Sequence, residues 1–471
     1  MTPDAREIVI IGSGIVGLCT AYSLLSLNQS VRVKVLESST ERQVAGGASK
    51  YAGGFIAGGE SWHNEPSRSL ARESWKCHSE MAEVLHGAEN YGWRECGAIG
   101  LSVGGPVRRS AYRSLPGGKG KEAVELEGEE GRLPKGEWVE GEKEELSPEG
   151  GVGQVDPSEF CETLFRYLSS TFSDRFSIEF GQAISIKRPP FPRSFAESFS
   201  PSSSSNHSTL SFQPYPSPQN TSSDENPLKD YRFDKLVIAA GPWSAQICET
   251  LKLPKIPISN LPGHSLLIRP SLDSYEPPAQ SSSNTKELPA GAVFAGIDGG
   301  VGGVHGDSFG LARGLSEEEK ARGYTQCPEF FVRKNGLVYV AGENSIPESA
   351  KASEVGLPNK LPRTVDGVKS MIDEECVGRL KRAAGAISPF LKEENGAKIE
   401  KTQLCYRPIS SDREPLIGFL DKDVLVATGM GPWGITLAPG SGKLVAEMVL
   451  ERELSADVSA LSPQRFGIEV K

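Results

Sequence analysis

The sequence lacks long apolar runs and clusters of basic residues. No stretch approaches the roughly 18 consecutive apolar residues that a membrane-spanning helix needs, so no membrane span is expected. The formal net charge is −10 at pH 7, and no block of Lys and Arg is present that would neutralise phosphates. A nucleic-acid partner is therefore not expected, and a small molecule is the expected ligand.

Paired cysteines are also missing. The 8 cysteines are scattered singly, without the short spacings of zinc sites or disulfide scaffolds, so no metal site is predicted. The first residues, MTPDAREIVI, do not combine a basic start with a long apolar core, and the last residues, FGIEVK, carry no peroxisomal or lipidation tag. We therefore expect a cytoplasmic protein in a reducing environment.

The chain is too long for one compact core, since domains usually hold roughly 100–200 residues. Three stretches interrupt the globular pattern, at about 115–153, 188–230 and 271–288. They are rich in Gly, Glu, Lys, Ser or Pro and contain little apolar surface to bury. We predict that all three are long polar loops inserted between the globular segments.

The N-terminal segment combines three local patterns. Ile8–Ile11 is a short apolar run, residues 12–17 read GSGIVG, and Leu18–Leu27 has the composition of a buried helix. This order predicts a strand, a glycine-rich turn and a helix. The turn has the spacing G-x-G-x-x-G in the setting that dinucleotide-binding proteins require.

Each glycine of this turn has a predicted role. Gly12 permits the tight turn, Gly14 lets the backbone approach a pyrophosphate at the helix N-terminus, and Gly17 lets helix and strand pack closely. A second strand, Val31–Leu36, is followed by Glu37, 20 residues after Gly17, where a carboxylate accepts hydrogen bonds from ribose hydroxyls. The alternative is a purely structural turn in which Glu37 caps the next segment.

NAD and FAD both use such a turn, and the following loop favours FAD. Residues 44–59 read VAGGASKYAGGFIAGG. Small residues and the Ser49 hydroxyl would supply donors to a pyrophosphate from its second side, which an NAD site does not require. The alternative, a flexible surface loop, is less favoured because the glycine pairs are interleaved with apolar and aromatic residues.

This loop resembles the second pyrophosphate-contact motif of the FAD-dependent D-amino-acid oxidase, glycine oxidase and sarcosine oxidase superfamily. The series of motifs is most similar to the topoisomerase-I-damage-affected oxidoreductases of fungi, and covers about three quarters of the chain, missing mainly the three polar stretches. The other matching segments, in chain order, are VDPSEF (155–160), KLVIAAGPWSAQI (235–247), LPGHSLLIRP (261–270), FFVRKNGLVYVAGEN (330–344), CYRPISSDREPLIG (405–418) and VLVATGMGPWGITLAPGSGKLVAEMV (424–449).

The resemblance implies an α/β protein with a Rossmann-like FAD-binding domain and an α+β substrate domain built on an antiparallel sheet. Both domains would be discontinuous. The FAD-binding domain would comprise residues 1–80, 152–260 and 400–471, and the substrate domain residues 81–151 and 261–399.

The resemblance also implies the residues that hold FAD. In this family the helix that follows the C-terminal glycine turn begins at the N1/C2 carbonyl edge of the flavin, where its positive end stabilises the reduced, anionic flavin. The implied cofactor-binding residues are Gly12, Gly14, Ile15, Val16, Gly17, Glu37, Ser38, Gly47, Ala48, Ser49, Gly53, Gly54, Ala183, Ala240, Gly241, Trp243, Cys405, Gly431, Trp433, Gly434, Ile435, Thr436 and Leu437.

Arg407 and Trp433 are the predicted catalytic residues. Arg407 occupies the position where amino-acid oxidases of the family place an arginine that binds the substrate carboxylate, and a planar guanidinium offers donors to both oxygens. The alternative is a structural arginine that pairs with Asp412 or Glu414 in the following loop.

Cys405 matches the cysteine that sarcosine and fructosyl-amine oxidases join to the flavin as a thioether. The alternative is a buried free thiol with noncovalent FAD, which we favour because isolated cysteines usually pack as small hydrophobes. The sarcosine-type enzymes also carry a lysine near the flavin that promotes reaction with oxygen. Residues 336–342 contain none, and Lys334 lies just outside, so the electron acceptor is oxygen or another molecule.

The sequence thus predicts an FAD-dependent oxidoreductase that oxidises the C–N bond of a small amine or amino acid by hydride transfer to flavin N5. No histidine base is required, because His264 is expected to be structural and His63 is only a weak candidate. Two alternatives stay open: an FAD dehydrogenase of a non-amine substrate with an acceptor other than oxygen, and a catalytically idle FAD-binding scaffold for protein partners.

Overall fold

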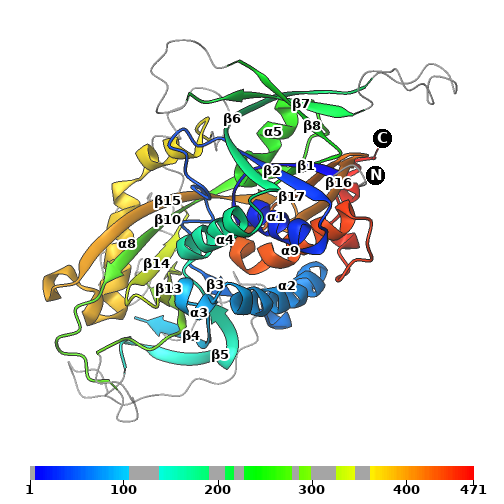
Figure 1. Ribbon diagram of the computed structural model, residues 1–471. Helices are drawn as coiled ribbons and strands as arrows, with labels where there is room; N and C mark the ends of the chain where they lie inside the picture. The colour runs from blue at the N-terminus through cyan, green and yellow to red at the C-terminus, as the bar shows by residue number, and fades with distance from the viewer. Residues whose placement is uncertain are drawn as a thin grey trace, which may run out of the picture.

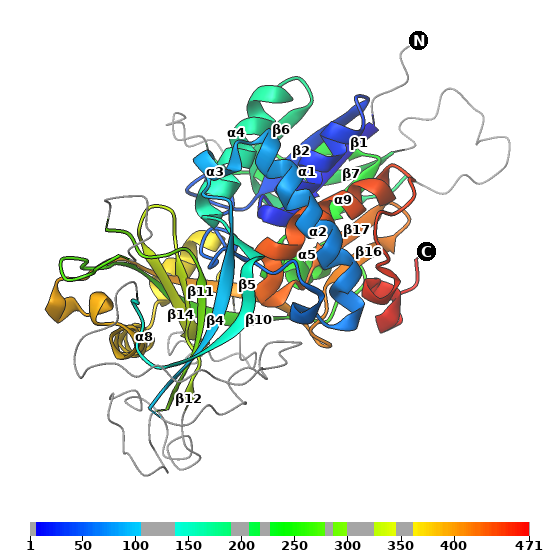
Figure 2. The same ribbon diagram turned by 90° about the horizontal axis from the view of Figure 1, so that it is seen from below.

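The chain folds around two β-sheets that lie side by side (Figures 1 and 2). The computed structural model describes residues 6–104, 137–189, 207–216, 227–277, 286–298, 325–344 and 361–470. Each sheet collects strands from distant parts of the chain, so both halves of the molecule are discontinuous in sequence.

The first sheet has the strand order β16-β17-β9-β1-β2-β6-β7-β8. The five strands from β17 to β6 are parallel to one another, while β16, β7 and β8 are antiparallel to their neighbours. The strands are β1 (Arg6–Ile11), β2 (Val31–Glu37), β6 (Phe176–Lys187), β7 (Ser208–Pro214), β8 (Lys229–Phe233), β9 (Lys235–Ile238), β16 (Leu416–Asp421) and β17 (Val424–Thr428).

Alternate residues of β1 face two different hydrophobic cores. Ile8 and Ile10 pack under the helices α1, α4 and α9, whereas Val9 and Ile11 pack on the side of α5 and β7. Burial on both faces explains why this strand reads as an unbroken apolar run. The helices of this half are α1 (Ile15–Leu27), α2 (Glu65–Val84), α4 (Pro157–Thr171), α5 (Ser244–Thr250) and α9 (Gly434–Val449).

The second sheet has the order β15-β10-β14-β13-β11-β4-β5-β3, with β12 paired to β11. Its pairs are antiparallel except that β4 and β11 are parallel, which the prediction of an antiparallel sheet did not include. Helix α8 (Glu374–Ile387) covers one face. The strands are β3 (Phe55–Ile56), β4 (Arg94–Val103), β5 (Glu142–Gln154), β10 (Ile258–Arg269), β11 (Ala292–Asp298), β12 (Thr325–Gln326), β13 (Glu329–Val332), β14 (Val338–Glu343) and β15 (Lys398–Ser410).

The remaining elements are short and connect the larger ones. Helix α3 covers Gly87–Asn90, and the others are 3₁₀ helices. They are η1 (Glu60–Trp62), η4 (Gly241–Trp243), η5 (Val365–Met371), η6 (Pro389–Leu391), η7 (Glu393–Asn395), η8 (Gly431–Trp433), η9 (Ser459–Leu461) and η10 (Pro463–Phe466).

The predicted N-terminal strand, turn and helix are confirmed, although the helix starts at Ile15, inside the glycine turn. Two loop predictions are wrong in part. Strand β5 occupies the end of stretch 115–153, and β7 and the start of β8 lie within 188–230. These strands form because backbone pairing with β4 and β6 stabilises segments with few apolar residues. The rest of both stretches lies largely outside the described residues, as does part of 271–288.

The boundary predicted at residue 400 also needs correction. It assigns most of β15 to the FAD-binding part, yet β15 pairs with β10 along its length in the second sheet. The chain therefore returns to the first sheet only after residue 410, at β16.

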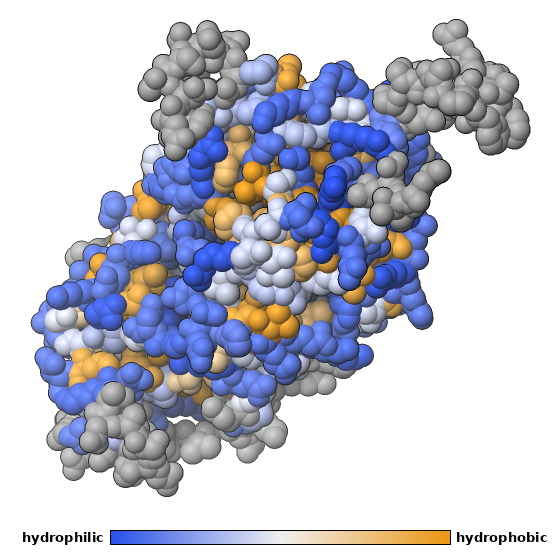
Figure 3. Space-filling view, in the orientation of Figure 1, coloured by the Kyte–Doolittle hydropathy of each residue, from blue (hydrophilic) through white to orange (hydrophobic). Residues whose placement is uncertain are grey.

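On the face shown in Figure 3, hydrophobic residues form separate small groups among hydrophilic ones. None of the helices in the described ranges is long and apolar enough to cross a membrane.

Candidate functional site

A cavity of about 710 Å³ lies between the two sheets. One side is formed at the carboxyl ends of β1, β2, β9 and β17, where ligands bind in open parallel sheets. The other side is formed by side chains of the second sheet, including Phe331, Tyr339 and Arg407. Because it spans both sheets, the cavity can hold a long ligand that connects the glycine turn to the second sheet.

The glycine turn needs two of its glycines for packing. Gly12 has φ of +106°, and a Cβ there would collide with the carbonyl oxygen of Ala239 at the end of β9. A Cβ at Gly17 would collide with the carbonyl oxygen of Gly12. Gly17 therefore acts as predicted in packing helix against turn, but it does not line the cavity.

Glu37, at the end of β2, stabilises this turn by hydrogen bonds. Its carboxylate accepts hydrogen bonds from the Ser13 backbone N–H at 2.8 Å, from Ser13 Oγ at 2.6 Å and from the Ser38 N–H at 2.8 Å. Burial raises the pKa of Glu37, although the hydrogen bonds oppose the shift. The carboxylate also lines the cavity, so it is placed to accept hydrogen bonds from a ligand.

The second glycine-rich loop closes over the start of α1. Ser49 Oγ accepts a hydrogen bond from the Ile15 N–H at 2.9 Å, and a Cβ at Gly14 would lie 3.3 Å from the same oxygen. Gly54 has φ of +87°, and a Cβ there would collide with the carbonyl oxygen of Val155. A Cβ at Gly53 would collide with the Phe331 ring, so this loop needs glycine to pack against the second sheet.

The C-terminal glycine turn and α9 approach the cavity from a second direction. Trp433, Gly434 and Ile435 line it, and the N-cap residue of α9 makes no side-chain cap hydrogen bond. Uncapped N-termini present free backbone donors and a positive partial charge. Two histidines hold this turn in place.

His63 donates from Nε2 to the Ala57 carbonyl at 2.7 Å, and its ring lies 5.0 Å from that of Trp433. His78 donates from Nε2 to the Ile435 carbonyl at 3.0 Å. Burial lowers the pKa of His63, and burial lowers the pKa of His78 to about 4. Both histidines are therefore neutral structural residues at physiological pH.

Arg407, on β15, extends across the neighbouring strand β10 toward β14. Its Nη2 would lie 2.5 Å from a Cβ at Gly263, so the absence of a side chain there makes room for the guanidinium. Nη1 donates to Asn344 Oδ1 at 2.8 Å. The guanidinium therefore lies in the cavity, as the substrate-binding prediction requires.

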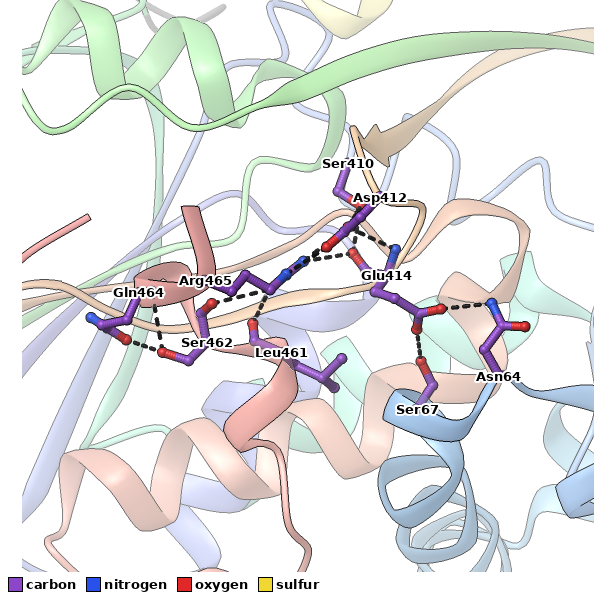
Figure 4. Close-up of polar contacts among 9 residues, drawn as sticks. All are labelled: Asn64, Ser67, Ser410, Asp412, Glu414, Leu461, Ser462, Gln464 and Arg465. Carbon is purple, nitrogen blue, oxygen red and sulfur yellow. Dashed lines mark hydrogen bonds and ion pairs between the residues drawn. The ribbon is translucent and has the colours of Figure 1, made fainter. Parts of the chain in front are cut away.

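The alternative prediction for Arg407, an ion pair with Asp412 or Glu414, is wrong. Asp412 accepts from Arg465 Nε at 2.7 Å, and Glu414 accepts from Asn64 Nδ2 at 2.6 Å and from the Ser67 hydroxyl (Figure 4). These groups bind the C-terminal turns and α2 to the loop after β15. Both carboxylates thus have other partners, and Arg407 contacts neither.

Cys405 lies two residues before Arg407 on the same face of β15 and lines the cavity. Burial raises the pKa of its thiol, while the nearby Arg407 acts in the opposite direction. The net shift favours the neutral thiol over the thiolate that a thioether link would need.

Most predicted cofactor residues share this cavity. Thr436 and Leu437, like Gly17, do not line it: Thr436 Oγ1 donates to the Phe55 carbonyl at 3.0 Å, and Leu437 is in the core beneath the first sheet. The predicted residues that do line the cavity are Gly12, Gly14, Ile15, Val16, Glu37, Ser38, Gly47, Ala48, Ser49, Gly53, Gly54, Ala183, Ala240, Gly241, Trp243, Cys405, Arg407, Gly431, Trp433, Gly434 and Ile435.

Among the polar lining residues that sequence reasoning missed are Glu329, Tyr339, Asn344 and Arg363. Tyr339 donates to the Tyr51 carbonyl at 3.2 Å, and burial raises its pKa to about 12, so it stays protonated. The alternation of strands β13 and β14 could have assigned Glu329 and Tyr339 to one face, but not which face meets the ligand.

Two weaker expectations are also resolved by the structure. His264 accepts from the Asp373 N–H at 3.0 Å outside the cavity lining, as expected of a structural residue. Lys334 donates to the carbonyls of Ala88 and Glu89, both at 2.8 Å, and does not line the cavity. Within the described ranges, no cluster of three or more His, Cys, Asp or Glu side chains could hold a metal ion.

Fold and site together define a dinucleotide-binding protein with a second, ligand-binding sheet. The family DAO, FAD dependent oxidoreductase, matches residues 7–171 and 219–448. The chain belongs to this family, and FAD is its cofactor. The match covers most of the chain on both sides of the second polar stretch.

Two curated fungal proteins are similar along nearly the whole chain. "Putative oxidoreductase C1F5.03c" of Schizosaccharomyces pombe is 24% identical, with 98% of each chain covered. "Putative oxidoreductase TDA3" of Saccharomyces cerevisiae is 24% identical, with 98% of this chain and 95% of that protein covered. The predicted resemblance to fungal oxidoreductases is thus confirmed.

Solved structures share the fold. Glycine oxidase from Geobacillus kaustophilus superposes with a TM-score of 0.61 at 17% identity, covering 97% of this chain and 98% of that one. L-Amino acid deaminase from Proteus myxofaciens, in complex with anthranilate, gives a TM-score of 0.62 at 16% identity, covering 98% and 94%. The predicted α/β fold with a Rossmann-like FAD-binding part is confirmed.

The residues of the cavity fit FAD. The side chain missing at Gly14, the N-terminus of α1 and the Ser49 loop would form a cradle for a pyrophosphate, and Glu37 suits a ribose. The uncapped start of α9 suits the carbonyl edge of a flavin.

Proposed function

We propose that this FAD-dependent oxidoreductase oxidises the C–N bond of a small amino acid or amine to an imine, which water then hydrolyses. The observation that carries the proposal is the Arg407 guanidinium in the cavity, which donates to the Asn344 amide oxygen and forms no ion pair with a carboxylate of the described residues. A guanidinium in such a setting suits a bidentate carboxylate ligand. Glycine oxidase and L-amino acid deaminase, whose names state amino-acid substrates, share the fold.

The chain's own residues would bind and orient the substrate. Arg407 would hold the carboxylate, while the aromatic rings of Phe331 and Tyr339 would exclude water from the reacting carbon. The chemistry that FAD supplies when bound is acceptance of a hydride equivalent from the carbon next to nitrogen. Trp433 and the start of α9 would supply the donors that favour the reduced state.

One observation favours an acceptor other than oxygen. The cavity lining contains no lysine among the residues described, and Lys334 is bound to two carbonyl groups of α3. We therefore propose dehydrogenase behaviour as the second candidate, for an amine or for a non-amine substrate. Peroxide assays compared with dye-coupled assays distinguish an oxidase from a dehydrogenase.

The compartment is proposed to be the cytoplasm. All 8 cysteines lie in described parts of the chain and are free thiols, which is typical of reducing compartments.

Anaerobic bleaching of the flavin absorbance by a panel of amino acids, amines and hydroxy acids tests the proposed reaction. Arg407→Lys should raise the KM for amino acids by about tenfold or more and change it little for uncharged amines, because an ammonium cannot reproduce the bidentate fork. Equal effects on both classes would contradict carboxylate binding by Arg407, and bleaching by hydroxy acids alone would contradict C–N oxidation.

A further inference from the structure

The cavity contains a second charged side chain near Arg407. Glu329, on β13, is paired with Ala341 on β14 and with Phe294 on β11. Two residues further along the same strand, Phe331 is paired with Tyr339. Residues two apart on a strand share a face, so Glu329 lies on the face of the sheet that lines the cavity.

The carboxylate of Glu329 has no hydrogen-bond or ion-pair partner among the residues that the structure describes. Arg407 interacts with it electrostatically, but the two side chains do not form a direct ion pair. Burial raises the pKa of Glu329, and Arg407 opposes this shift. A partly buried carboxylate without a donor is costly, and a cationic ligand group would remove that cost.

A small residue lies beside each of the two charges, and Tyr339 interacts electrostatically with both. The guanidinium of Arg407 lies over Gly263 and reaches Asn344, just beyond the end of β14. Glu329 lies on the next strand, opposite Ala341. Neighbouring strands are about 4.8 Å apart, so the slot between the charges is of the size of the few atoms that separate the carboxylate and amine of an amino acid.

We propose that Glu329 binds the cationic amino group of the ligand whose carboxylate Arg407 binds, so that the site selects zwitterionic amino acids over simple amines and simple carboxylates. This inference rests on the proposed function and assigns the second half of its substrate recognition. Glu329 is thus assigned to substrate binding, and together with Arg407 it favours a ligand that carries both an ammonium and a carboxylate group.

Three ligands of similar size separate the contributions of the two charges. The FAD-loaded protein is titrated with alanine, propylamine and propionate, and dissociation constants are taken from the perturbation of the flavin absorbance. Glu329→Gln should raise the dissociation constants of alanine and propylamine about tenfold or more, since a hydrogen bond to a charged group contributes free energy of this size. Propionate should bind as tightly or more tightly, because a negative charge has been removed from its site.

Two further variants serve as controls. Glu329→Asp keeps the charge and should retain part of the amine affinity. Glu400→Gln removes a carboxylate of the same sheet that pairs with Arg269 at the surface, and should leave all three constants unchanged. If Glu329→Gln weakens the binding of all three ligands equally, Glu329 has a structural role. If the three dissociation constants are unchanged, Glu329 does not contact the ligand. Either result overturns the inference.

Failure of the proposed function has a different signature. If no amino acid bleaches the flavin, C–N oxidation is contradicted. The binding constants for propylamine and propionate still decide the role of Glu329, because they do not depend on turnover.

Discussion

At the scale of residues, the neighbours of Arg407 and Cys405 determine what these two side chains can do in the site. Arg407 is available to a ligand because Gly263 leaves room for its guanidinium and because Asp412 and Glu414 are bound elsewhere. Cys405, its neighbour on the strand, is buried beside it. Both residues were identified from sequence, but the surroundings of Arg407 were not, since Gly263 lies on β10 and the groups that bind Asp412 and Glu414 come from the C-terminal turns and the start of α2.

Cys405 provides a prediction at the residue scale. Because burial raises the pKa of its thiol, we expect FAD to be held noncovalently. Protein precipitated with acid should turn white, and all the flavin should appear in the supernatant. The intact mass of the denatured chain should equal that of the polypeptide alone, and Cys405→Ala should keep its flavin under native conditions. Yellow precipitate with a mass larger by one FAD would show a thioether link.

At the scale of elements, α9 is packed unusually closely against its neighbours. A Cβ at Gly442 would lie 2.5 Å from the carbonyl carbon of Cys19 on α1, and one at Gly440 would lie 2.9 Å from Ser74 Cβ on α2. The glycines allow three helices to approach one another beneath the first sheet. This packing positions the uncapped start of α9 at the cavity.

Gly442→Ala should therefore destabilise the protein. The added methyl group meets backbone atoms that cannot move independently, so we expect a loss of about 2 kcal/mol in the free energy of unfolding, measured by urea denaturation. Gly378→Ala on α8 is the matched control, because its nearest neighbour is the flexible end of Arg382. That substitution should be neutral or stabilising by about 0.5 kcal/mol. A similar loss in both variants would contradict the packing argument.

At the scale of the whole molecule, the segment with η5, which lies between β14 and α8 of the second half in the chain, contacts the loop after β2 of the first sheet. Asp366, on η5, accepts hydrogen bonds from Ser39 Oγ at 2.9 Å and from the Thr40 N–H at 2.6 Å. The adjacent Val365 packs on the glycine-rich loop, and Arg363 lines the cavity. The two halves are thus joined beside the cofactor cavity.

Breaking this junction should weaken FAD binding. Asp366→Ala removes the acceptor for the loop after β2, so we expect the dissociation constant of FAD to rise about tenfold, measured by flavin fluorescence with the apoprotein. Lys369→Ala removes only the exposed ion pair between this segment and Glu41, so the dissociation constant of FAD should change little. If both variants bind FAD equally well, the segment does not support the cofactor site.

Local sequence patterns were sufficient to predict the N-terminal part of the first sheet and its glycine turn. The glycine turn, its strand and helix, and Glu37 lie within one short segment, so backbone sterics and spacing predict them directly. The loop predictions for residues 142–154 and 208–214 failed because those strands depend on pairing with β4 and β6, and few of their own residues indicate it.

The sequence by itself determined the cofactor, through the glycine turn and the motifs that follow it, and the identity of Arg407 as a candidate ligand contact. Only the tertiary structure decided which charges meet in the cavity. Glu329 and Arg407 come from strands separated in the sheet by β10 and β14, and that order is set by long-range pairing rather than by neighbouring residues. The zwitterion-binding site that we propose could therefore be inferred only from the assembled sheet.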